Sequence, residues 1–298
     1  MSKKWLAVDW GTTNFRAWLM QDADIISVIN DSCGLLQVEN SRFEETLESR
    51  VAPWIAELGS IPILMAGMVG SQQGWINVPY CEGSVGAQQL AQGAYALKTR
   101  WGSEGWILPG VAGRSMTGLP DVMRGEDVQL AGLIALSPAD HHHAILPGTH
   151  SKHATVERNA IQQFSTYMTG ELYQLLMTYS LLGRDLPPQH PDSRAFALGV
   201  QNSALPAPLS QLIFSVRTLR LRGDIPLSGV GDYLSGLLIG QELRHCMHIP
   251  HWIIGSDALN ARYQQAASQL NLVMKTLSAE HCFIAGMNQI RLYLQGNN

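Results

Sequence analysis

The hydrophobic positions near the start of the chain form two short apolar runs separated by a polar turn. Residues 5–8 are apolar and lead to Asp9, a G-T-T turn follows at residues 11–13, and a second run covers residues 15–20. This pattern predicts two strands joined by a tight turn. The amides of such a turn can hold a phosphate, and the acid beside it can hold hydrated Mg²⁺. An ordinary hairpin with an acid in its turn fits the same spacing.

The same pattern returns about half a chain later. An apolar run at residues 144–146 leads into P-G-T-H-S-K at residues 147–152, and another strand-like run follows. Two such strand–turn–strand units, so far apart, predict a duplicated two-domain fold. We expect the two phosphate loops to face each other across a cleft.

Strand-like and helical patterns alternate along the rest of the chain. Apolar residues recur every four positions between residues 43 and 55 and predict an amphipathic helix, with a capping box at residues 41–44 and a kink or break at Pro53. Further strands are expected at residues 24–29, 61–66, 106–108, 161–168, 249–254 and 271–275. Further helices are expected from residue 125, at residues 170–182, in a proline-containing region to about residue 208, and at residues 230–244 and 281–294. Residues 255–258 are expected to lead into another helix that runs through residue 270. The alternation predicts an α/β fold with parallel pairing, and we place the domain boundary near residue 140.

Composition excludes several classes of protein. The chain has 298 residues, a formal net charge of −4 and no basic run longer than two residues, which argues against a nucleic-acid partner. No apolar run approaches the length of a membrane span, and the first apolar run is too short for a signal peptide. The four cysteines are dispersed, as expected in a reducing compartment. We therefore expect a cytoplasmic protein with no membrane partner.

Three motifs resemble those of the sugar kinase, Hsp70 and actin superfamily. D-W-G-T-T-N-F-R-A at residues 9–17 resembles its first phosphate motif, residues 147–152 resemble the second, and Gly255-Ser256 resembles the adenosine motif. Within that superfamily, several further segments are similar to the 2-dehydro-3-deoxygalactonokinase family, and they follow one another along nearly the whole chain. These segments are residues 65–71, 123–126, 146–150, 168–172, 234–240 and 261–266.

The resemblance implies a fold and an activity. The fold would be two duplicated actin-like (ribonuclease H-like) domains around a central cleft for ATP and substrate. Residues 1–140 would bind the substrate and carry the first phosphate loop, and residues 141–298 would bind the nucleotide. The reaction would be ATP-dependent phosphorylation of the 6-hydroxyl of 2-dehydro-3-deoxy-D-galactonate in D-galactonate catabolism.

The resemblance also assigns roles to residues of the nucleotide site. Asp9 would hold Mg²⁺ through water, and Arg16 would neutralise charge on the transferring group. An exposed strand arginine without a catalytic role is the alternative for Arg16. The nucleotide would be contacted by the residues of the three motifs, namely Gly11, Thr12, Thr13, Gly148, Thr149, Lys152, Gly255 and Ser256.

The catalytic base is expected at the start of the helix near Gly125. In phosphoryl transfer the protein chiefly positions the reactants, and a base orients the nucleophile. Matching the residues that follow the acid in related sugar kinases points to Asp127, but the neighbouring Glu126 leaves the register open. A third alternative is that both acids only stabilise the positive end of the helix dipole.

The sugar acid needs a few placed polar groups and a donor for its carboxylate. The resemblance points to Ser71, Gln72 and Trp75 in the loop after a strand, and to Arg124 beside the proposed base. A purely connective loop is the alternative. Two other functions stay open: a kinase for another sugar or sugar acid, and a non-kinase actin-like ATPase. A homodimer is a further expectation.

Overall fold

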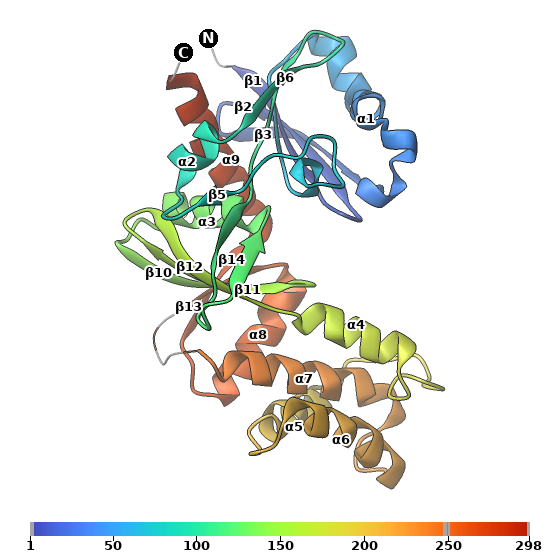
Figure 1. The fold of residues 1–298 in the computed structure, drawn as a ribbon. Coiled ribbons are helices and arrows are strands. Elements are labelled where there is room, and N and C mark those ends of the chain that lie inside the picture. Colours follow the sequence, from blue (N-terminus) through green and yellow to red (C-terminus); the bar gives the residue numbers. More distant parts are fainter. Residues whose placement is uncertain (1–2, 247–248, 250, 297–298) are drawn as a thin grey trace. The chain divides into compact units, whose positions relative to one another are not determined.

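A computed structural model describes residues 3–246, 249 and 251–296 (Figure 1). The chain forms two compact units. The first consists of Met1–His141, Ala154–Phe164 and Ala279–Asn298, and the second of His142–His153 and Ser165–Ser278. The expected division near residue 140 into a substrate-binding and a nucleotide-binding domain stays a prediction.

The first unit is built on a sheet with the strand order β3-β2-β1-β4-β7-β6. Its strands are β1 (Lys4–Trp10), β2 (Phe15–Gln21), β3 (Asp24–Asp31), β4 (Ile63–Ala66), β6 (Tyr95–Lys98) and β7 (Glu104–Ile107). The β1–β2 and β2–β3 pairs are antiparallel, whereas β1–β4 and β4–β7 are parallel. The predicted first hairpin is confirmed, with Asp9 opposite Arg16 in its register.

A second sheet has the order β12-β11-β10-β13-β14. Its strands are β10 (His141–Leu146), β11 (Ser151–Glu157), β12 (Ala160–Tyr167), β13 (His251–Gly255) and β14 (Met274–Ser278). The β10–β13 and β13–β14 pairs are parallel. In the first sheet, strands β3-β2-β1-β4-β7 lie in the spatial order third, second, first, fourth and fifth when these five are numbered along the chain, and β12-β11-β10-β13-β14 of the second sheet have the same order. The predicted duplication is therefore confirmed. A small third sheet contains β5 (Cys81–Glu82), β8 (Val111–Arg114) and β9 (Pro120–Met123).

The helices agree with most of the sequence expectations. They are α1 (Phe43–Leu58), α2 (Ala87–Gln92), α3 (Glu126–Leu136), α4 (Thr169–Tyr179), α5 (Ser193–Asn202), α6 (Leu209–Arg222), α7 (Val230–Leu243), α8 (Asp257–Gln269) and α9 (Ala279–Gly296). The apolar pattern did not reveal α2 or α6, and it gave no bounds for α5 within the proline-containing region before residue 208. None of the helices in the described ranges combines the length and the apolar character needed to cross a membrane.

Around α1, the expected capping box and the expected break at Pro53 are wrong, whereas a kink at Pro53 stays a prediction. The helix begins at Phe43 after Arg42 and has no side-chain cap, so Ser41 and Glu44 do not form a capping box. Ser41 instead ends a short 3₁₀ turn with a left-handed backbone, and the Glu44 carboxylate accepts a hydrogen bond from the Arg100 amide. The helix also runs without a break through Pro53.

The turn between β1 and β2 rests on a buried aromatic cluster. Trp10 and Phe15 flank the turn and are both fully buried. Their rings pack edge to face with centroids 5.1 Å apart, and Phe43 of α1 lies 5.7 Å from Trp10. This packing fixes both ends of the turn that carries the predicted first phosphate motif.

Glycines allow two pairs of helices to pack closely. At Gly132 of α3 and Gly286 of α9, an added Cβ atom would collide with the backbone carbonyl of Cys282 and of Val128, respectively. At Gly236 of α7 it would collide with the Phe196 carbonyl of α5. The helices α7 and α9 therefore pack closely on different partners, α5 and α3.

Candidate active site

The first phosphate loop is held by its carbonyl groups. The amides of Gly34, Leu35 and Leu36 donate to the carbonyl oxygens of Thr13, Gly11 and Thr12 at 3.1, 3.0 and 3.2 Å. The side chains of Thr12 and Thr13 are exposed. The Gly11 amide donates to the Asn14 carbonyl at 2.9 Å, so the exposed hydroxyl groups of Thr12 and Thr13, and not the Gly11 amide, can donate to an anion.

Asp9 lies at the end of β1 beside this loop. Its Oδ2 atom accepts a hydrogen bond from Arg16 Nη2 at 2.5 Å, and the two side chains are 19% and 33% exposed. A Cβ atom at Gly67 would lie 3.2 Å from Asp9 Oδ1, so Oδ1 faces the loop that follows β4. Asp9, Gly11, Thr13 and Arg16 line one pocket of about 500 Å³.

The start of α3 lies against the same loop after β4. Gly125 has a φ of +107°, a conformation that favours glycine, and a Cβ atom there would lie 3.7 Å from the Gly67 Cα atom. Gly67 therefore lies close to both Asp9 and the helix that carries Glu126 and Asp127. This contact places the predicted metal ligand and the two candidate bases in the same region of the first unit.

The two candidate bases differ in environment. Asp127 is fully buried, its Oδ1 atom accepts a hydrogen bond from the Gly125 amide at 2.5 Å, and its Oδ2 atom has no hydrogen-bond partner among the described residues. Burial raises the pKa of Asp127 to about 7, and the charge of Glu126 adds to this effect. Glu126 is half-buried, and its Oε2 atom accepts a hydrogen bond from the Arg124 amide at 3.2 Å.

Arg124 connects the predicted sugar loop to α3. Its guanidinium group donates to the Val78 carbonyl at 2.9 Å and lies 4.5 Å from the ring centroid of Tyr80. Ser71 is buried, and its Oγ atom has no hydrogen-bond partner in the described part of the chain. Gln72 is exposed and Trp75 is half-buried. The four predicted sugar-binding residues thus belong to the first unit, and their role stays a prediction.

The second phosphate loop joins β10 to β11 in the second unit. Gly148 has open space around its Cα atom, and Thr149 is exposed. Lys152 is buried, and its Nζ atom donates to the His150 carbonyl at 3.1 Å. The Lys152 ammonium group is therefore directed back to the loop.

The start of α4 packs on this loop. The Glu171 amide donates to the Thr149 carbonyl at 2.9 Å, and the Glu171 carboxylate contacts the His150 ring. Gly148, Thr169 and Gly170 line a pocket of about 200 Å³ together with side chains of α4, α7 and α8, namely Tyr173, Ser235, Leu238, Ile239, Leu259, Arg262 and Tyr263. Gly148 leaves open space beside the loop. Gly170 instead allows α4 to pack directly on the loop, because an added Cβ atom there would lie 2.4 Å from the Gly148 carbonyl oxygen.

The adenosine motif lies at the start of α8. Gly255 ends β13, where a Cβ atom would lie 3.5 Å from Pro147 Cδ, so this motif is close to the second phosphate loop. Ser256 caps α8 by accepting a hydrogen bond from the Leu259 amide at 3.4 Å. Tyr263 of α8 is 2% exposed and packs within the protein.

Several residues of this arrangement were not singled out in the sequence. Gly34 and Gly67 support the first loop and Asp9. Gly34 belongs to no motif, whereas Gly67 lies in the family-like segment at residues 65–71 but was given no role. Thr169 lies in one of the family-like segments, so a signal was present without a role. Glu242 lies beside the second loop and belongs to no motif.

The repeated strand order, with a glycine–threonine loop after the first strand of each repeat, defines an actin-like α/β fold. The fold is shared with the activator of the 2-hydroxyisocaproyl-CoA dehydratase from Clostridium difficile. That crystal structure aligns with 99% of this chain and 97% of its own at a TM-score of 0.52 and 11% identity. At this identity the likeness concerns the fold alone.

The particular family follows from closer similarities. The family model for 2-keto-3-deoxy-galactonokinase matches residues 9–290. The 2-dehydro-3-deoxygalactonokinase of Escherichia coli K12 is 35% identical over 97% of this chain and 98% of its own length. A crystal structure described as a 2-dehydro-3-deoxygalactonokinase from Sinorhizobium meliloti has a TM-score of 0.87 and 30% identity, and covers 96% of this chain and 97% of its own. The chain belongs to the 2-keto-3-deoxy-galactonokinase family, so the predicted family and kinase class are confirmed.

Proposed function

We propose that this protein transfers the γ-phosphoryl group of ATP to the 6-hydroxyl of 2-dehydro-3-deoxy-D-galactonate, as a step of D-galactonate catabolism. The observation that carries the proposal is the family match across residues 9–290. The relative from Escherichia coli named for this activity covers nearly the whole chain, so the assignment does not depend on a shared fragment.

Asp127 is proposed as the base that orients the 6-hydroxyl. Its unpartnered Oδ2 atom and its pKa of about 7 support this role, because a base with a pKa near the working pH can accept the hydroxyl proton. Glu126 is the competing candidate because it is more exposed and lies in the same helical turn.

Asp9 is proposed to hold Mg²⁺ through water. A single partly exposed carboxylate at a phosphate loop suits this hard cation, which keeps several waters and binds phosphate oxygens. The metal would supply neutralisation of phosphate charge. Arg16, which is paired with Asp9, is proposed to contribute positive charge beside the same loop.

The nucleotide phosphates are assigned to the two glycine–threonine loops, through Gly11, Thr12, Thr13, Gly148 and Thr149. Lys152 is assigned to the same site because its ammonium group lies 3.1 Å from a carbonyl oxygen of the second loop. Gly255 and Ser256 are assigned to the adenosine.

The sugar acid is assigned to Ser71, Gln72, Trp75 and Arg124. The buried and unpartnered Ser71 Oγ supports this assignment, since a buried hydroxyl group favours a partner. Arg124 donates to Val78 and packs on Tyr80, and it can therefore also act by holding the loop in shape.

A coupled assay of ADP release tests the substrate class. Purified protein with Mg-ATP is supplied with 2-dehydro-3-deoxy-D-galactonate, with the gluconate-derived acid, and with neutral hexoses. The largest kcat/KM is expected for the first acid. Stimulation by neutral hexoses and not by this acid would overturn the substrate assignment.

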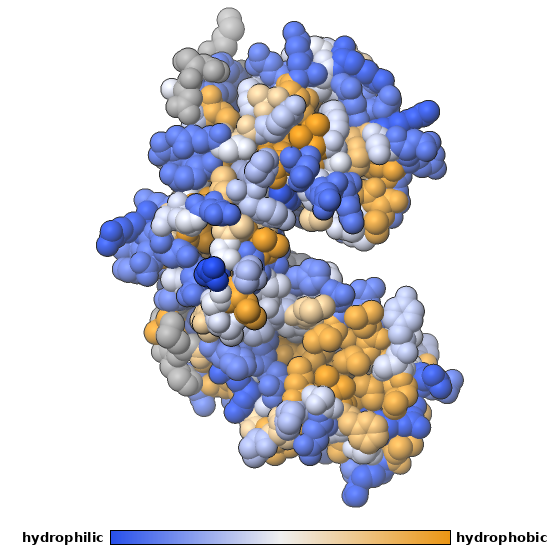
Figure 2. Space-filling model, viewed as in Figure 1, coloured by the Kyte–Doolittle hydropathy of each residue, from blue (hydrophilic) through white to orange (hydrophobic). Residues whose placement is uncertain are grey.

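A homodimer is proposed through the surface around α4. None of the α4 side chains is buried, and Figure 2 shows hydrophobic side chains gathered in this region. The exposed apolar residues here are Met168, Leu175, Tyr179 and Leu181. Glu171 is the one charged residue of α4, so two copies of this face can meet without strong repulsion between like charges.

Sedimentation analysis of the wild type and of Leu175→Glu tests this interface, with an expected change from dimer to monomer. A monomeric wild type would contradict it.

A cytoplasmic location is also proposed, because the four cysteines are unpaired. Cell fractionation tests that location.

A further inference from the structure

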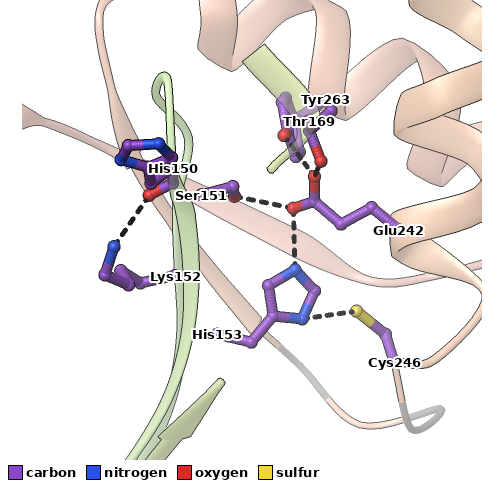
Figure 3. A network of polar contacts seen from close by, with 8 residues as sticks. All are labelled: His150, Ser151, Lys152, His153, Thr169, Glu242, Cys246 and Tyr263. Carbon is purple, nitrogen blue, oxygen red and sulfur yellow. Dashed lines mark hydrogen bonds and ion pairs between the residues drawn. The ribbon is translucent and has the colours of Figure 1, made fainter. Parts of the chain in front are cut away.

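A buried carboxylate lies beside the second phosphate loop (Figure 3). Glu242, near the end of α7, is 2% exposed and accepts four hydrogen bonds. Its Oε1 atom accepts from Ser151 Oγ at 2.7 Å and from His153 Nε2 at 2.8 Å. Its Oε2 atom accepts from Tyr263 OH at 2.8 Å and from the hydroxyl group of Thr169.

The four donors come from three segments that surround the proposed nucleotide site. Ser151 and His153 lie on β11 directly after the second phosphate loop, Thr169 is the first residue of α4, and Tyr263 lies on α8 behind the adenosine motif. Thr169 and Tyr263 line the same pocket as Gly148, whereas Glu242 does not. Glu242 therefore contacts the supports of the pocket and is itself outside it.

The network is consistent with an ionised Glu242. Burial alone would raise the pKa of this carboxyl group, but the hydrogen bonds from His153, Thr169 and Ser151 outweigh burial and lower the pKa below its ordinary value. Burial raises the pKa of the Cys246 thiol to about 12. A protonated thiol 3.7 Å from His153 Nδ1 can donate to it, which leaves the Nε2 proton for Glu242.

We propose that Glu242 is a positioning residue for the nucleotide, because its carboxylate holds the exit of the second phosphate loop, the first turn of α4 and α8 in one arrangement. This inference rests on the proposed ATP-dependent function. The alternative is a carboxylate that only stabilises the fold. The two roles can be separated by comparing variants. If Glu242 positions the nucleotide, a variant at Glu242 binds nucleotide more weakly than a variant elsewhere in the protein that is destabilised by the same amount.

The substitution Glu242→Gln separates these roles while nearly preserving shape. The amide offers one acceptor oxygen and directs an NH₂ group toward two of the four donors, so Thr169 and Tyr263 or Ser151 and His153 lose their acceptor. Because hydrogen bonds to a charged group are strong, the Kd for ADP is expected to rise at least about tenfold. ADP binding is measured by calorimetry, without turnover.

Two further variants serve as controls. Val216→Ala removes volume from the buried core at α6, a helix that supplies neither a donor to Glu242 nor a residue to the pocket beside Gly148, and it should lower the melting temperature without changing the Kd for ADP. Ser151→Ala removes one donor that does not line the pocket, and should raise the Kd for ADP about threefold. Ser151→Ala also keeps the inference testable if Glu242→Gln fails to fold.

The outcomes separate the two proposals. If the wild type binds no ADP, the proposed function fails. If the wild type binds ADP but Glu242→Gln and Ser151→Ala bind it equally well, the positioning role is wrong and the network is structural. A rise in Kd for these two variants, with Val216→Ala unchanged, supports it.

Discussion

Two buried carboxyl groups of this protein have opposite pKa shifts, and the cause lies in their hydrogen bonds. Asp127 has the Gly125 amide as its donor, so burial dominates and raises its pKa to about 7. Glu242 accepts from four side chains, which lowers its pKa despite comparable burial. A raised pKa suits a group that exchanges a proton, and a lowered pKa suits a group that holds a fixed charge.

The identity of the base is tested by two neighbouring substitutions. Asp127→Asn should lower kcat by about 10²–10⁴-fold, because the 6-hydroxyl loses its proton acceptor. The KM for ATP should change little, and Glu126→Gln should have a smaller effect. Steady-state kinetics on both variants decides between the two acids. If Glu126→Gln has the large loss of kcat and Asp127→Asn a small one, Glu126 is the base. If both losses of kcat are small, the two acids only stabilise the helix dipole.

The buried Asp127 also predicts a dependence of stability on pH. The pKa of Asp127 is about 7 in the folded protein and near 4 in the unfolded chain. Its favourable contribution to the free energy of unfolding is therefore complete below about pH 4 and is lost as the pH rises through 7. Asp127→Asn keeps an acceptor for the Gly125 amide and carries no charge. Its stability relative to the wild type should therefore increase between pH 4 and pH 8, by up to about 4 kcal/mol.

Denaturant unfolding of both proteins across this pH range measures the difference. Asp224, an exposed acid paired with Arg222, supplies the control Asp224→Asn, which should show no such trend. A constant difference between Asp127→Asn and wild type at all pH values would mean that Asp127 is not buried as an acid with a raised pKa.

The metal role of Asp9 is tested by Asp9→Asn. The Mg²⁺ concentration at half-maximal activity should rise about tenfold or more, because one carboxylate ligand of the hydrated ion is lost. Stability should fall by no more than about 1 kcal/mol, since the Asp9–Arg16 pair is partly exposed. Circular dichroism checks the fold, and an unchanged Mg²⁺ dependence in a folded variant would exclude the role.

At the scale of elements, close helix packing supports the start of α3. Gly132 of α3 and Gly286 of α9 bring these helices into backbone contact, and α3 carries both candidate bases at its first turn. The apolar periodicity predicted α3 and α9 separately. It could not predict their contact, because the contact depends on backbone approach at two distant glycines. The contact of Gly199 in α5 with the Tyr233 carbonyl of α7 is another of this kind.

The packing of α3 on α9 predicts the effect of Gly132→Ala. The added Cβ atom would collide with the Cys282 carbonyl, so the helices must separate, and stability should fall by about 1–3 kcal/mol or more. Gly296→Ala in α9 is the matched control, since a Cβ atom there meets nothing within 4 Å. Thermal unfolding compares them, and equal melting temperatures would contradict the close contact.

At the scale of the whole molecule, two sheets with the same strand order carry two similar loops. The sequence predicted this duplication because strand–turn–strand signals are local and recur. It also predicted Asp9, the glycine–threonine loops and the acids of α3 as motif residues. The burial of Asp127, the support of Asp9 by Gly67 and the donors of Glu242 depend on long-range contacts, which a single sequence does not encode in any local pattern.

The proposed reaction phosphorylates a sugar acid at its terminal hydroxyl. ³¹P and ¹³C NMR of the product formed by the wild-type protein from Mg-ATP and 2-dehydro-3-deoxy-D-galactonate tests this reaction directly. We expect one new phosphomonoester signal, coupled to C6, that forms in step with ADP. Release of inorganic phosphate alone, or a phosphate attached at another carbon, would contradict it.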